Sequence, residues 1–480
     1  MNRQSAKITF SVLLIIAVIS SCSSPRVDLI PTATAFRTKT STTSTNIIFL
    51  SPTPDITNAY FVSPSGDDTN PGTETQPWRT IQKAADTLTA GETVYIRGGV
   101  YEESVYISNS GTQEQPIRFL AYPGEIPIID GSNYELPNAY WGALLGIPGD
   151  YIQVTGLEVR YSNWIGVSLA GHHNRASNMN VHHNRETGVL VSGDYGIFEN
   201  GRVWQNANRN ENNPGSSDWA SGLSAARHPT NVILYGNSVY NNWGEGLSTF
   251  EANGTIIEAN IVYDNWAGNI YVSDSVNVVV QRNLVYESDN DINSSGSVGI
   301  MLGDETYNPP SSNVTVINNI VFGTLRNFYW WQGRQGGGMD DVLIANNTFV
   351  NSTEKAGIQI DNGHHQDVRV YNNIIQQYGP LPVSIILSLD GIIFSNNLWS
   401  KTPPSIVIGH GDLIGDPKLK KVGDFTSPEW YCLLADSPAR NHAMQIREVV
   451  NDFFGKPRSQ QPDIGAFEYE DVSQIPIPVP

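Results

Sequence analysis

A repeat centred on asparagine dominates the middle of this 480-residue chain. In each copy, alternating apolar residues lead to an Asn, and further apolar residues follow it. The copies place this Asn at Asn237, Asn260, Asn283, Asn319, Asn347, Asn373 and Asn397, with spacings of 23, 23, 36, 28, 26 and 24 residues. Self-similarity at such a period is typical of solenoids, in which each copy buries its apolar side chains against the next.

The length of the repeat selects the kind of solenoid. Alternating apolar residues indicate strands, and Asn or Gly between them indicates turns, so one period holds three short strands and three turns. The period is too short for a propeller blade and lacks the leucine pattern of leucine-rich repeats. We therefore expect an all-β fold, a right-handed single-stranded parallel β-helix of about 10–12 coils, stacked about 4.8 Å apart. The repeated Asn side chains should form an internal ladder with a structural role.

Composition narrows the function classes. The chain carries 28 Lys and Arg against 47 Asp and Glu, a formal net charge of -19. Nucleic acid is a poor partner for so acidic a chain, because phosphate binding needs a basic surface. The two cysteines, Cys22 and Cys432, provide neither a disulfide framework nor a cysteine zinc site.

The ends of the repeat region need caps, because a solenoid leaves its terminal coils open. Ile81, Ala84, Ala85 and Leu88 have helical spacing and predict a short helix over the first coil. The period is lost after about residue 405. We expect the β-helix with its N-terminal cap over residues 58–405, a C-terminal cap segment over 406–470 and a disordered tail over 471–480.

The N-terminus has the features of a secretion signal. Arg3 and Lys7 precede an apolar run over residues 8–19, which is short for a membrane span. The sequence Ile-Ser-Ser-Cys ending at Cys22 resembles a bacterial lipobox, which implies removal of residues 1–21 and lipidation of Cys22. Residues 22–57, rich in Ser, Thr and Pro, then form a tether. We expect a secreted, monomeric lipoprotein at the cell surface or in the periplasm, attached to the membrane only through this anchor.

Several segments resemble secreted bacterial pectate-lyase-like β-helix proteins. Three of them lie near the N-terminus, over residues 60–68, 78–84 and 94–101. The sequence Asp-Ile-Gly-Ala-Phe-Glu-Tyr over 463–469 resembles the C-terminal tail of the same group. This resemblance covers about residues 58–470 and implies a parallel β-helix and a polysaccharide partner. It does not select a reaction, because the superfamily includes lyases, hydrolases, epimerases and non-catalytic binders.

Aligning the coils on their glycines separates inward from outward positions. Alternation along the strand places Val189, Leu223, Leu247, Ile270 and Ile300 inside. The outward positions would form the floor of a groove; they are Ser168, Leu190, Ser224, Ser248, Tyr271 and Met301.

A row of aromatic residues lies just before the same strands. It contains Trp219, Trp243 and Trp266, and Tyr329–Trp331 could extend it. With Tyr271, the three Trp residues are candidates to stack on sugar rings. The alternative is an internal aromatic stack at the corner of the coil.

A polar column follows the same strands. It contains Arg227, Glu251, Asp274 and Asp304, with His228 and Glu305 beside it and Asp218 and Glu245 at the other strand edge. Stacked carboxylates repel each other unless a cation lies among them. We therefore expect a calcium ion bound by Asp218, Glu251, Asp274 and Asp304. Arg227 could supply the charge instead, or the edge could be solvated and bind nothing.

Among the reactions of this superfamily we favour a calcium-assisted lyase of a uronic-acid polymer, for which the resemblance implies calcium and a Lys or Arg base as the proton acceptor. Arg227 or His228 fits this role, and Lys355 is a second candidate several coils away. A glycoside hydrolase would instead pair Glu245 with Glu251 or Asp274. The motifs expected of polygalacturonases and of common pectate lyases are absent. A non-catalytic glycan-binding lipoprotein and a purely structural solenoid stay open as well.

Overall fold

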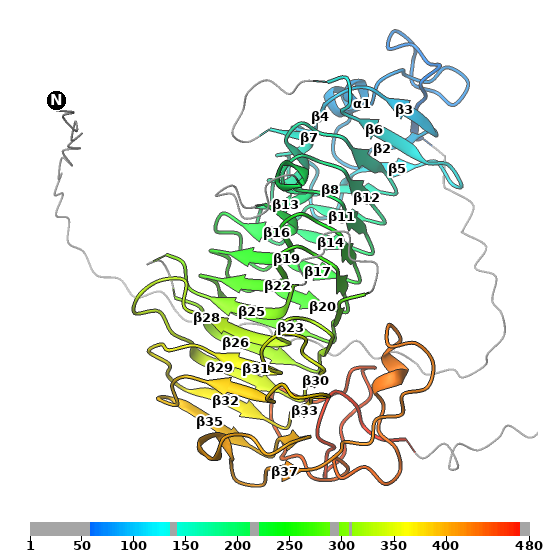
Figure 1. Ribbon diagram of the computed structural model, residues 1–480. Helices are drawn as coiled ribbons and strands as arrows, with labels where there is room; N and C mark the ends of the chain where they lie inside the picture. The colour runs from blue at the N-terminus through cyan, green and yellow to red at the C-terminus, as the bar shows by residue number, and fades with distance from the viewer. Residues whose placement is uncertain (1–57, 135–141, 212–219, 289–296, 307–309, 471–480) are drawn as a thin grey trace, which may run out of the picture. The chain divides into compact units, whose positions relative to one another are not determined.

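Three parallel β-sheets form the solenoid, and each coil contributes one strand to each sheet (Figure 1). The computed structural model describes residues 58–134, 142–211, 220–288, 297–306 and 310–470. Neighbours within a sheet are three strands apart in the chain, except that β1 pairs with β2 and β36 with β37 at the ends. The paired strands of the described residues run parallel, as β19 does with β16 and β22. The second sheet has 11 strands, so the solenoid has eleven coils with all three sheets present, within the expected range.

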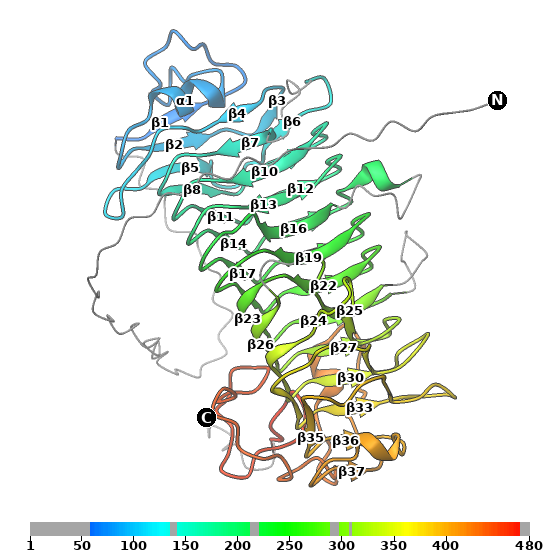
Figure 2. The same cartoon turned by 90° about the vertical axis from the view of Figure 1, so that its left-hand side faces the viewer.

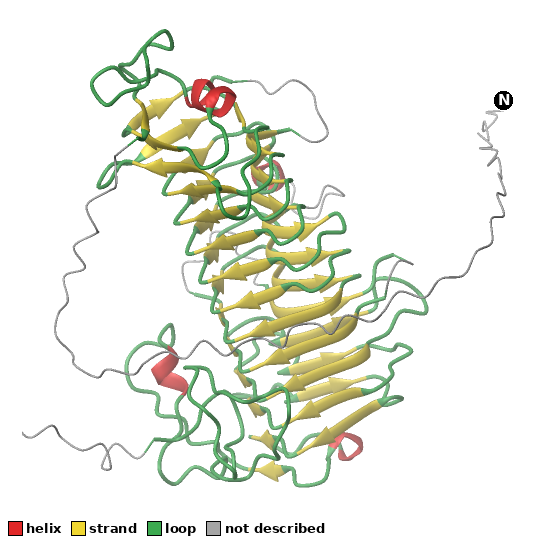
Figure 3. Cartoon of the chain, turned by 180° about the vertical axis from the view of Figure 1, so that it is seen from behind, coloured by secondary structure: helices red, strands yellow, loops and turns green. Residues whose placement is uncertain are grey.

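The strands of each sheet follow one another along the solenoid (Figure 3). The first sheet contains β1 (Tyr60–Val62), β2 (Thr93–Ile96), β5 (Ile117–Ala121), β8 (Ile152–Thr155), β11 (Arg175–Ser177), β14 (Ile197–Glu199), β17 (Ile233–Tyr235), β20 (Ile256–Glu258), β23 (Val276–Gln281), β26 (Ser312–Ile317), β29 (Asp340–Ala345), β32 (Val368–Tyr371) and β35 (Ile392–Ser395). The second sheet contains β4 (Val105–Tyr106), β7 (Ala143–Ile147), β10 (Ile165–Leu169), β13 (Val189–Val191), β16 (Ser221–Ala226), β19 (Glu245–Phe250), β22 (Gly268–Ser273), β25 (Val298–Gly303), β28 (Phe328–Trp331), β31 (Ile358–Ile360) and β34 (Ser384–Ile386). The third sheet contains β3 (Gly99–Tyr101), β6 (Pro127–Asp130), β9 (Glu158–Arg160), β12 (Asn180–His182), β15 (Arg202–Trp204), β18 (Ser238–Tyr240), β21 (Ile261–Tyr263), β24 (Leu284–Tyr286), β27 (Ile320–Phe322), β30 (Thr348–Val350), β33 (Ile374–Gln376), β36 (Leu398–Trp399) and β37 (Leu413–Ile414).

Helix is confined to short pieces in the described residues. The α-helix α1 (Ile81–Thr87) lies at the N-terminal end of the solenoid, as expected (Figure 2). Its N-cap is Thr80, whose hydroxyl accepts a hydrogen bond from the Lys83 backbone N–H at 3.1 Å. The apolar side of α1 is buried against the first coils. Three 3₁₀ turns complete the helical content: Asn208–Asn210, Ser405–Val407 and Pro428–Tyr431.

The inward and outward columns of the second sheet follow the predicted alternation. Val189, Leu223, Leu247, Ile270 and Ile300 are all fully buried in one continuous apolar core. Strand registers connect the predicted outward positions into one column, Ser168–Leu190–Ser224–Ser248–Tyr271–Met301. The sequence alignment was therefore correct to the residue on this sheet, and the outward column forms the surface on which the site is built.

The asparagine ladder is confirmed, and it is continuous. Each amide Nδ2 donates to the Oδ1 of the next ladder Asn at 2.9–3.1 Å, from Asn237 to Asn397. A second ladder, which the sequence analysis did not identify, runs through Asn184, Asn206, Asn242, Asn265 and Asn269 at 2.8–3.0 Å. The two ladders satisfy buried turn amides at two corners of the coil, before and after the third sheet.

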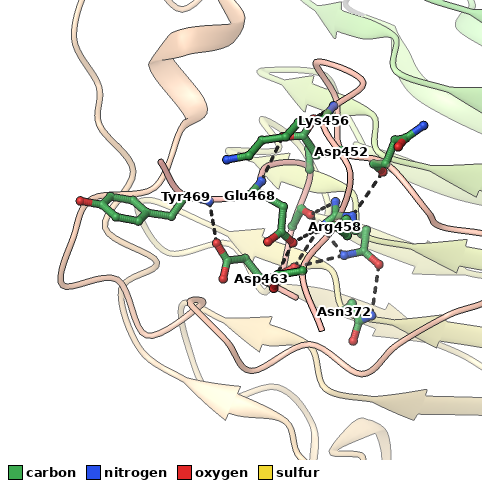
Figure 4. Close-up of polar contacts among 12 residues, drawn as sticks. Asn372, Asp452, Lys456, Arg458, Asp463, Glu468 and Tyr469 are labelled. Carbon is green, nitrogen blue, oxygen red and sulfur yellow. Dashed lines mark hydrogen bonds and ion pairs between the residues drawn. The ribbon is translucent and has the colours of Figure 1, made fainter. Parts of the chain in front are cut away.

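The C-terminal segment folds back along the third sheet (Figure 1). Tyr431, Leu433, Ile464 and Phe467 pack with apolar residues of the third sheet in one buried cluster. A central cation holds the segment in place (Figure 4): the side chain of Arg458, only 5% exposed, pairs with Glu468 at 3.1 Å. The cation also donates to the Asn318 side chain at 2.6 Å and to backbone carbonyls of the segment. The segment predicted over 406–470 therefore contacts the side of the solenoid over several coils.

The predictions for both ends of the chain lie outside the described residues. These are the signal segment, the lipidation of Cys22, the tether over 22–57 and the tail over 471–480. No helix among the described ranges has the length and apolar character needed to cross a membrane.

Candidate functional site

A groove lies on the outer face of the second sheet, over the middle coils. It encloses about 420 Å³ and extends from the coil of β10 to the loop after β25. Hydroxyl, carboxyl and guanidinium groups line it together with a few apolar side chains. The lining residues are Ile165, Thr187, Leu190, Ala220, Ser221, Ser224, Ala226, Arg227, Glu245, Ser248, Thr249, Phe250, Glu251, Tyr271, Ser273 and Glu305. The groove therefore runs along the solenoid axis, across neighbouring coils.

Glu245 is the buried acid of this groove. It begins β19 and is 9% exposed. Burial raises the pKa of its carboxyl to about 7, and the negative charge of Glu305 adds to this increase. The Ser221 hydroxyl donates to Glu245 Oε2 at 3.2 Å and partly opposes the increase. A carboxyl with this pKa can release or accept a proton near neutral pH, which an ordinary exposed glutamate does poorly.

A chain of serine hydroxyls leads from Glu245 along the groove floor. Ser221 Oγ lies 2.8 Å from Ser248 Oγ, and Ser248 donates to Ser224 Oγ at 2.9 Å. All three hydroxyls are buried. The outward column predicted Ser224 and Ser248, whereas Ser221 was missed because it lies at the strand start, where the alternation gives no signal.

Tyr271 and Glu305 form the C-terminal wall of the groove. The Tyr271 hydroxyl donates to Glu305 Oε1 at 2.6 Å. Burial and the Glu305 charge raise the pKa of Tyr271 far above its ordinary value, so it stays a phenol and a hydrogen-bond donor. Tyr271 was predicted as a substrate-binding residue. Glu305 was predicted to lie beside the polar column, with no catalytic or binding role assigned to it.

Three predicted residues meet at the opposite rim of the groove. Arg227 and His228 are exposed, and His228 Nε2 lies 3.4 Å from Glu251 Oε2. Partial burial lowers the pKa of Arg227. Arg227 and His228 have φ values of 76° and 63°, the only consecutive non-glycine residues with positive φ in the described ranges. Such strained backbone is common at functional sites.

Asp274 and Asp304, the acids further along the polar column, accept hydrogen bonds from backbone amides. Asp274 is fully buried and accepts hydrogen bonds from the backbone N–H groups of Glu305 and Thr306, both at 2.9 Å. Asp304 is also fully buried and accepts from the Ser311 and Gly338 N–H groups at 2.8 and 3.0 Å. These carboxylates stabilise the loops after β25 and β28, and the neighbouring amides, in place of a metal, offset their charge.

The described residues do not form the calcium site expected from the sequence. Asp218 lies outside them, and Glu251, Asp274 and Asp304 do not come together as a set of ligands. Across the described ranges, no three His, Cys, Asp or Glu side chains are grouped so that they could hold a metal ion. The donors of Asp274 and Asp304 already occupy the oxygens that calcium would need.

The remaining candidates lie away from the groove. Trp243 and Trp266 are half-buried in the turns before β19 and β22 and are not among the groove-lining residues, and Trp219 lies outside the described residues. Lys355 is exposed and pairs with the neighbouring Glu354 at 3.0 Å. The structure thus brings Arg227, Glu245, Glu251 and Tyr271 together as lining residues of one groove, and His228 lies beside the groove, next to Glu251.

This set of groups suits a reaction on an acidic polymer. The rim carries a cation for a substrate anion, the floor carries a proton-transfer group, and the wall carries a phenol donor. An elongated groove across several coils suits a chain molecule, because successive units of the chain can meet successive coils.

Comparisons with known proteins agree with this arrangement at the level of the fold. A family model described as "Pel9A-like, right handed beta helix region" matches residues 60–325, which include the whole groove. The chain is 34% identical to pectate lyase L of Paenibacillus polymyxa over 115 residues, 23% of this chain and 25% of that protein. It is 29% identical to pectate lyase PEL9 of Emericella nidulans over 193 residues, 38% and 47% of the two chains.

The solved structure of pectate lyase Pel9A extends the likeness of fold along the chain. It superposes with a TM-score of 0.53 at 19% identity and covers 86% of this chain and 96% of that one. The sequence matches to the two curated relatives, in contrast, span only a quarter to a half of their length. Since the family model matches more than half of the chain, this protein belongs to the Pel9A-like right-handed β-helix family.

Proposed function

We propose that this protein is a polysaccharide lyase that binds a uronic-acid polymer in the groove and cleaves it by β-elimination. The observation that carries the proposal is Glu245, a groove carboxyl whose pKa of about 7 suits proton transfer at neutral pH. The names of the relatives, pectate lyases, support the reaction class.

The chemistry of β-elimination explains the need for these groups. A base removes the proton next to the uronate carboxylate, the electron pair forms a double bond, and the glycosidic oxygen leaves with a proton. The carboxylate must be neutralised, because negative charge builds up on it as the proton leaves. A site therefore needs a cation, a proton acceptor and a proton donor within reach of one sugar.

We assign these roles to groups of the groove. Arg227 binds the substrate carboxylate at the rim, with His228 beside it. Ionised Glu245 accepts the proton and later releases it to solvent, and the Ser221 hydroxyl stabilises its ionised form. The Tyr271 phenol, which Glu305 orients, turns its O–H from Glu305 to the substrate, protonates the leaving glycosidic oxygen and regains a proton from solvent. No step in this scheme passes through calcium, because the described carboxylates do not fit a calcium site.

Glycoside hydrolysis is the second candidate, and one observation favours it. At a pKa of about 7, Glu245 is largely protonated below neutral pH, as the general acid of a hydrolase must be. Glu251 lines the same groove and could activate water as the general base. A groove that binds glycan without cleaving it is the third possibility.

We also propose that the protein works at the bacterial cell envelope as a monomer. Residues 1–21 have the composition of a lipoprotein signal, and lipid on Cys22 would hold the enzyme near its polymer. Mass spectrometry of the membrane fraction tests this: a diacylated N-terminal peptide beginning at Cys22 is expected. Release of unlipidated protein by cells would contradict it.

A depolymerisation assay tests the reaction. The purified chain is incubated with pectate, alginate and glycosaminoglycans, with calcium or with a chelator. The ultraviolet absorbance of unsaturated uronate and the reducing ends are followed together. Both signals together support the lyase, and reducing ends without absorbance support the hydrolase. Retention of a polymer on a column with neither signal indicates a binding protein.

A further inference from the structure

Arg326, at the second sheet, differs from most arginines of the chain in the groups that its side chain contacts. Many arginines of this acidic chain have a carboxylate partner in the structure. The paired ones are Arg97, Arg160, Arg175, Arg209, Arg282, Arg369 and Arg458. Arg326 has none among the described residues: its Nε donates to Gln359 Oε1 at 2.8 Å, and its two terminal nitrogens have no hydrogen-bond or ion-pair partner there. A half-buried arginine without an acid is a candidate to bind an anion.

Arg326 shares a register column with Glu245. Gly268 pairs with Val298, and extending the registers Leu247 with Ile270 and Ile300 with Phe328 back by two residues adds Glu245 and Arg326 to the same column. Arg326 therefore lies three coils beyond Glu245, a distance of about 14 Å at the usual spacing between strands. A pyranose in an extended chain advances by about the spacing of one coil, so a polymer bound along the groove would reach Arg326 about three sugars beyond Glu245.

Two half-exposed aromatic side chains, Tyr329 and Trp331, follow Arg326 on β28, which begins two residues after it. Tyr329 occupies the outward column two coils beyond Tyr271, and the Arg326 guanidinium lies over its ring, 5.0 Å from the centroid. The Tyr329 hydroxyl donates to Asp361 Oδ2 at 2.7 Å, which holds the ring in place. Gln359, the partner of Arg326, also donates to Asp361 Oδ1 at 2.9 Å.

Trp331 connects this cluster to the groove. It ends β28 on the outward side, next to Gly303 of the neighbouring strand. A Cβ added at Gly333 would lie 3.1 Å from both the Trp331 ring and the Glu305 side chain, so the ring and the C-terminal wall of the groove are close neighbours. A Cβ added at Gly303 would lie 2.8 Å from the Tyr271 hydroxyl and 3.2 Å from its ring, so Tyr271 of the groove wall lies over the residue paired with Trp331.

We propose that Arg326, Tyr329 and Trp331 form a second sugar-binding subsite, which takes a uronate three sugars away from the one at Glu245. Arg326 pairs with the uronate carboxylate through its free nitrogens, and the aromatic rings contact the apolar faces of the sugars. Asp361 and Gln359 position Tyr329 and Arg326. The proposal rests on the proposed function in one respect, that the ligand is an acidic polysaccharide.

Oligogalacturonates of two lengths test the subsite. Trigalacturonate is too short to span Glu245 and Arg326, whereas hexagalacturonate reaches both. With the full chain, Arg326→Ala should raise KM for the hexamer about tenfold, equivalent to about 1.4 kcal/mol, with kcat little changed. KM for the trimer should stay at the wild-type value. Arg326→Lys should restore part of the hexamer affinity, and Trp331→Ala should weaken it.

Arg369→Ala is the matched control, because Arg369 is paired with Asp341 on the first sheet, away from the groove. It should leave both KM values unchanged. Thermal unfolding midpoints of all variants show whether a loss of affinity comes from misfolding, and Arg326→Lys, which keeps the charge, gives a folded reference.

Direct binding separates this proposal from the proposed function. Hexagalacturonate binding is measured by calorimetry on Glu245→Gln protein with and without Arg326→Ala. If the wild-type chain cleaves nothing but Arg326→Ala still weakens binding, the subsite stands and the lyase proposal fails. If the chain cleaves galacturonan and the hexamer-to-trimer KM ratio is the same in Arg326→Ala and Trp331→Ala as in wild type, the subsite is wrong and the lyase proposal stands. Absence of any hexagalacturonate binding overturns the subsite.

Discussion

Two outer faces of the same solenoid use their side chains in opposite ways. On the third sheet, Trp204, Tyr240, Tyr263 and Tyr286 stack with centroids 4.7–6.0 Å apart and planes within 11° of parallel. Phe425 of the C-terminal segment then packs edge-on against Tyr286. On the second sheet, the middle coils carry a hydroxyl chain, an acid with a raised pKa and a rim arginine.

The comparison shows that aromatic content alone does not locate a glycan site in a β-helix. A sugar needs a free ring face, and the rings of the third sheet already cover each other's faces. The groove of the second sheet is lined by charged and hydrogen-bonding groups in place of stacked rings. Function is therefore expected on the face with fewer aromatic contacts and more titratable groups.

The largest expected effect is on catalysis at the second sheet. Glu245→Gln keeps the shape of the side chain but cannot accept a proton, so we expect kcat to fall by about 10²–10⁴-fold. Binding of hexagalacturonate should persist. Glu258→Gln on the first sheet, where Glu258 pairs with Arg282, is the control and should keep wild-type turnover. Full turnover by Glu245→Gln would remove Glu245 from the reaction.

The pH dependence distinguishes the two reactions proposed for this groove. If Glu245 is the base of a lyase, kcat/KM should rise with pH up to about 7, because the base must be ionised. If Glu245 is the general acid of a hydrolase, kcat/KM should instead fall as pH rises through about 7. Initial rates between pH 5 and pH 9 decide between the two reactions. In Glu245→Gln, the change in kcat/KM near pH 7 should be absent.

The free energy of unfolding should also depend on the titration of the Glu245 carboxyl. The folded chain raises the pKa of Glu245 from 4.5 to about 7, so it binds one proton more than the unfolded chain between these values. This contribution to the free energy of unfolding is complete below about pH 4.5 and is lost as pH rises through about 7. Denaturant unfolding of wild type and Glu245→Gln measures it: the difference between the two proteins should change across this window and be constant above it.

The next largest effect is expected on stability, at the ion pair of the C-terminal segment that packs on the third sheet. Arg458→Ala leaves Glu468 buried without its cation, which should cost about 3–5 kcal/mol in the free energy of unfolding. The double change Arg458→Met with Glu468→Leu should cost less, because no buried charge is left. Urea unfolding measures both. If the double variant instead loses the sum of the two single losses of unfolding free energy, the Arg458–Glu468 ion pair does not explain the stability of the C-terminal segment.

A smaller effect is expected at the loop behind the groove. Asp274→Ala removes the acceptor of the Glu305 and Thr306 amides, which should cost about 1–3 kcal/mol. It should also raise KM, because Glu305 and Tyr271 lose their fixed positions. Calcium titration by calorimetry should give the same result before and after the change. A calcium signal that disappears with Asp274 would restore the metal role predicted from the sequence.

The smallest effect should come from the aromatic stack. Tyr240→Leu keeps an apolar side chain but removes two ring contacts, at a cost of about 0.5–1.5 kcal/mol. Oligogalacturonate binding should not change. Weaker binding in this variant would break the comparison between the two faces, because it would give the stack a part in ligand recognition.

The sequence predicted the fold and the columns because both depend on periodicity. Ladder asparagines recur once per coil, and alternation fixes which side chains of a strand point outward, so Ser224, Ser248 and Tyr271 could be placed without a structure. For the same reason the predicted residues Arg227, Glu245 and Glu251 line one groove, with His228 beside it.

The site details that could not be predicted lie where the period breaks. Glu305 reaches Tyr271 from a loop that belongs to no repeat, and Asp274 turns its carboxylate onto amides of that loop. Periodicity says nothing about such contacts. The C-terminal segment did leave a signal: Asn318, Asn346, Asn372 and Asn396, each directly before a ladder Asn, all bind it through their side chains. Doubled asparagines thus mark the coils that this segment covers.

The ladder that begins at Asn237 has an electrical direction as well as a structural role. Every amide in it donates toward the C-terminal end of the solenoid, so the small side-chain dipoles add along the axis, as peptide dipoles do in a helix. At the end the last amide, Asn397, faces the carboxylate of Asp412, which also accepts from the Asn397 backbone N–H at 2.8 Å. A negative charge thus terminates the positive end of the array. Each further coil would lengthen this array, and its last amide would again need an anion.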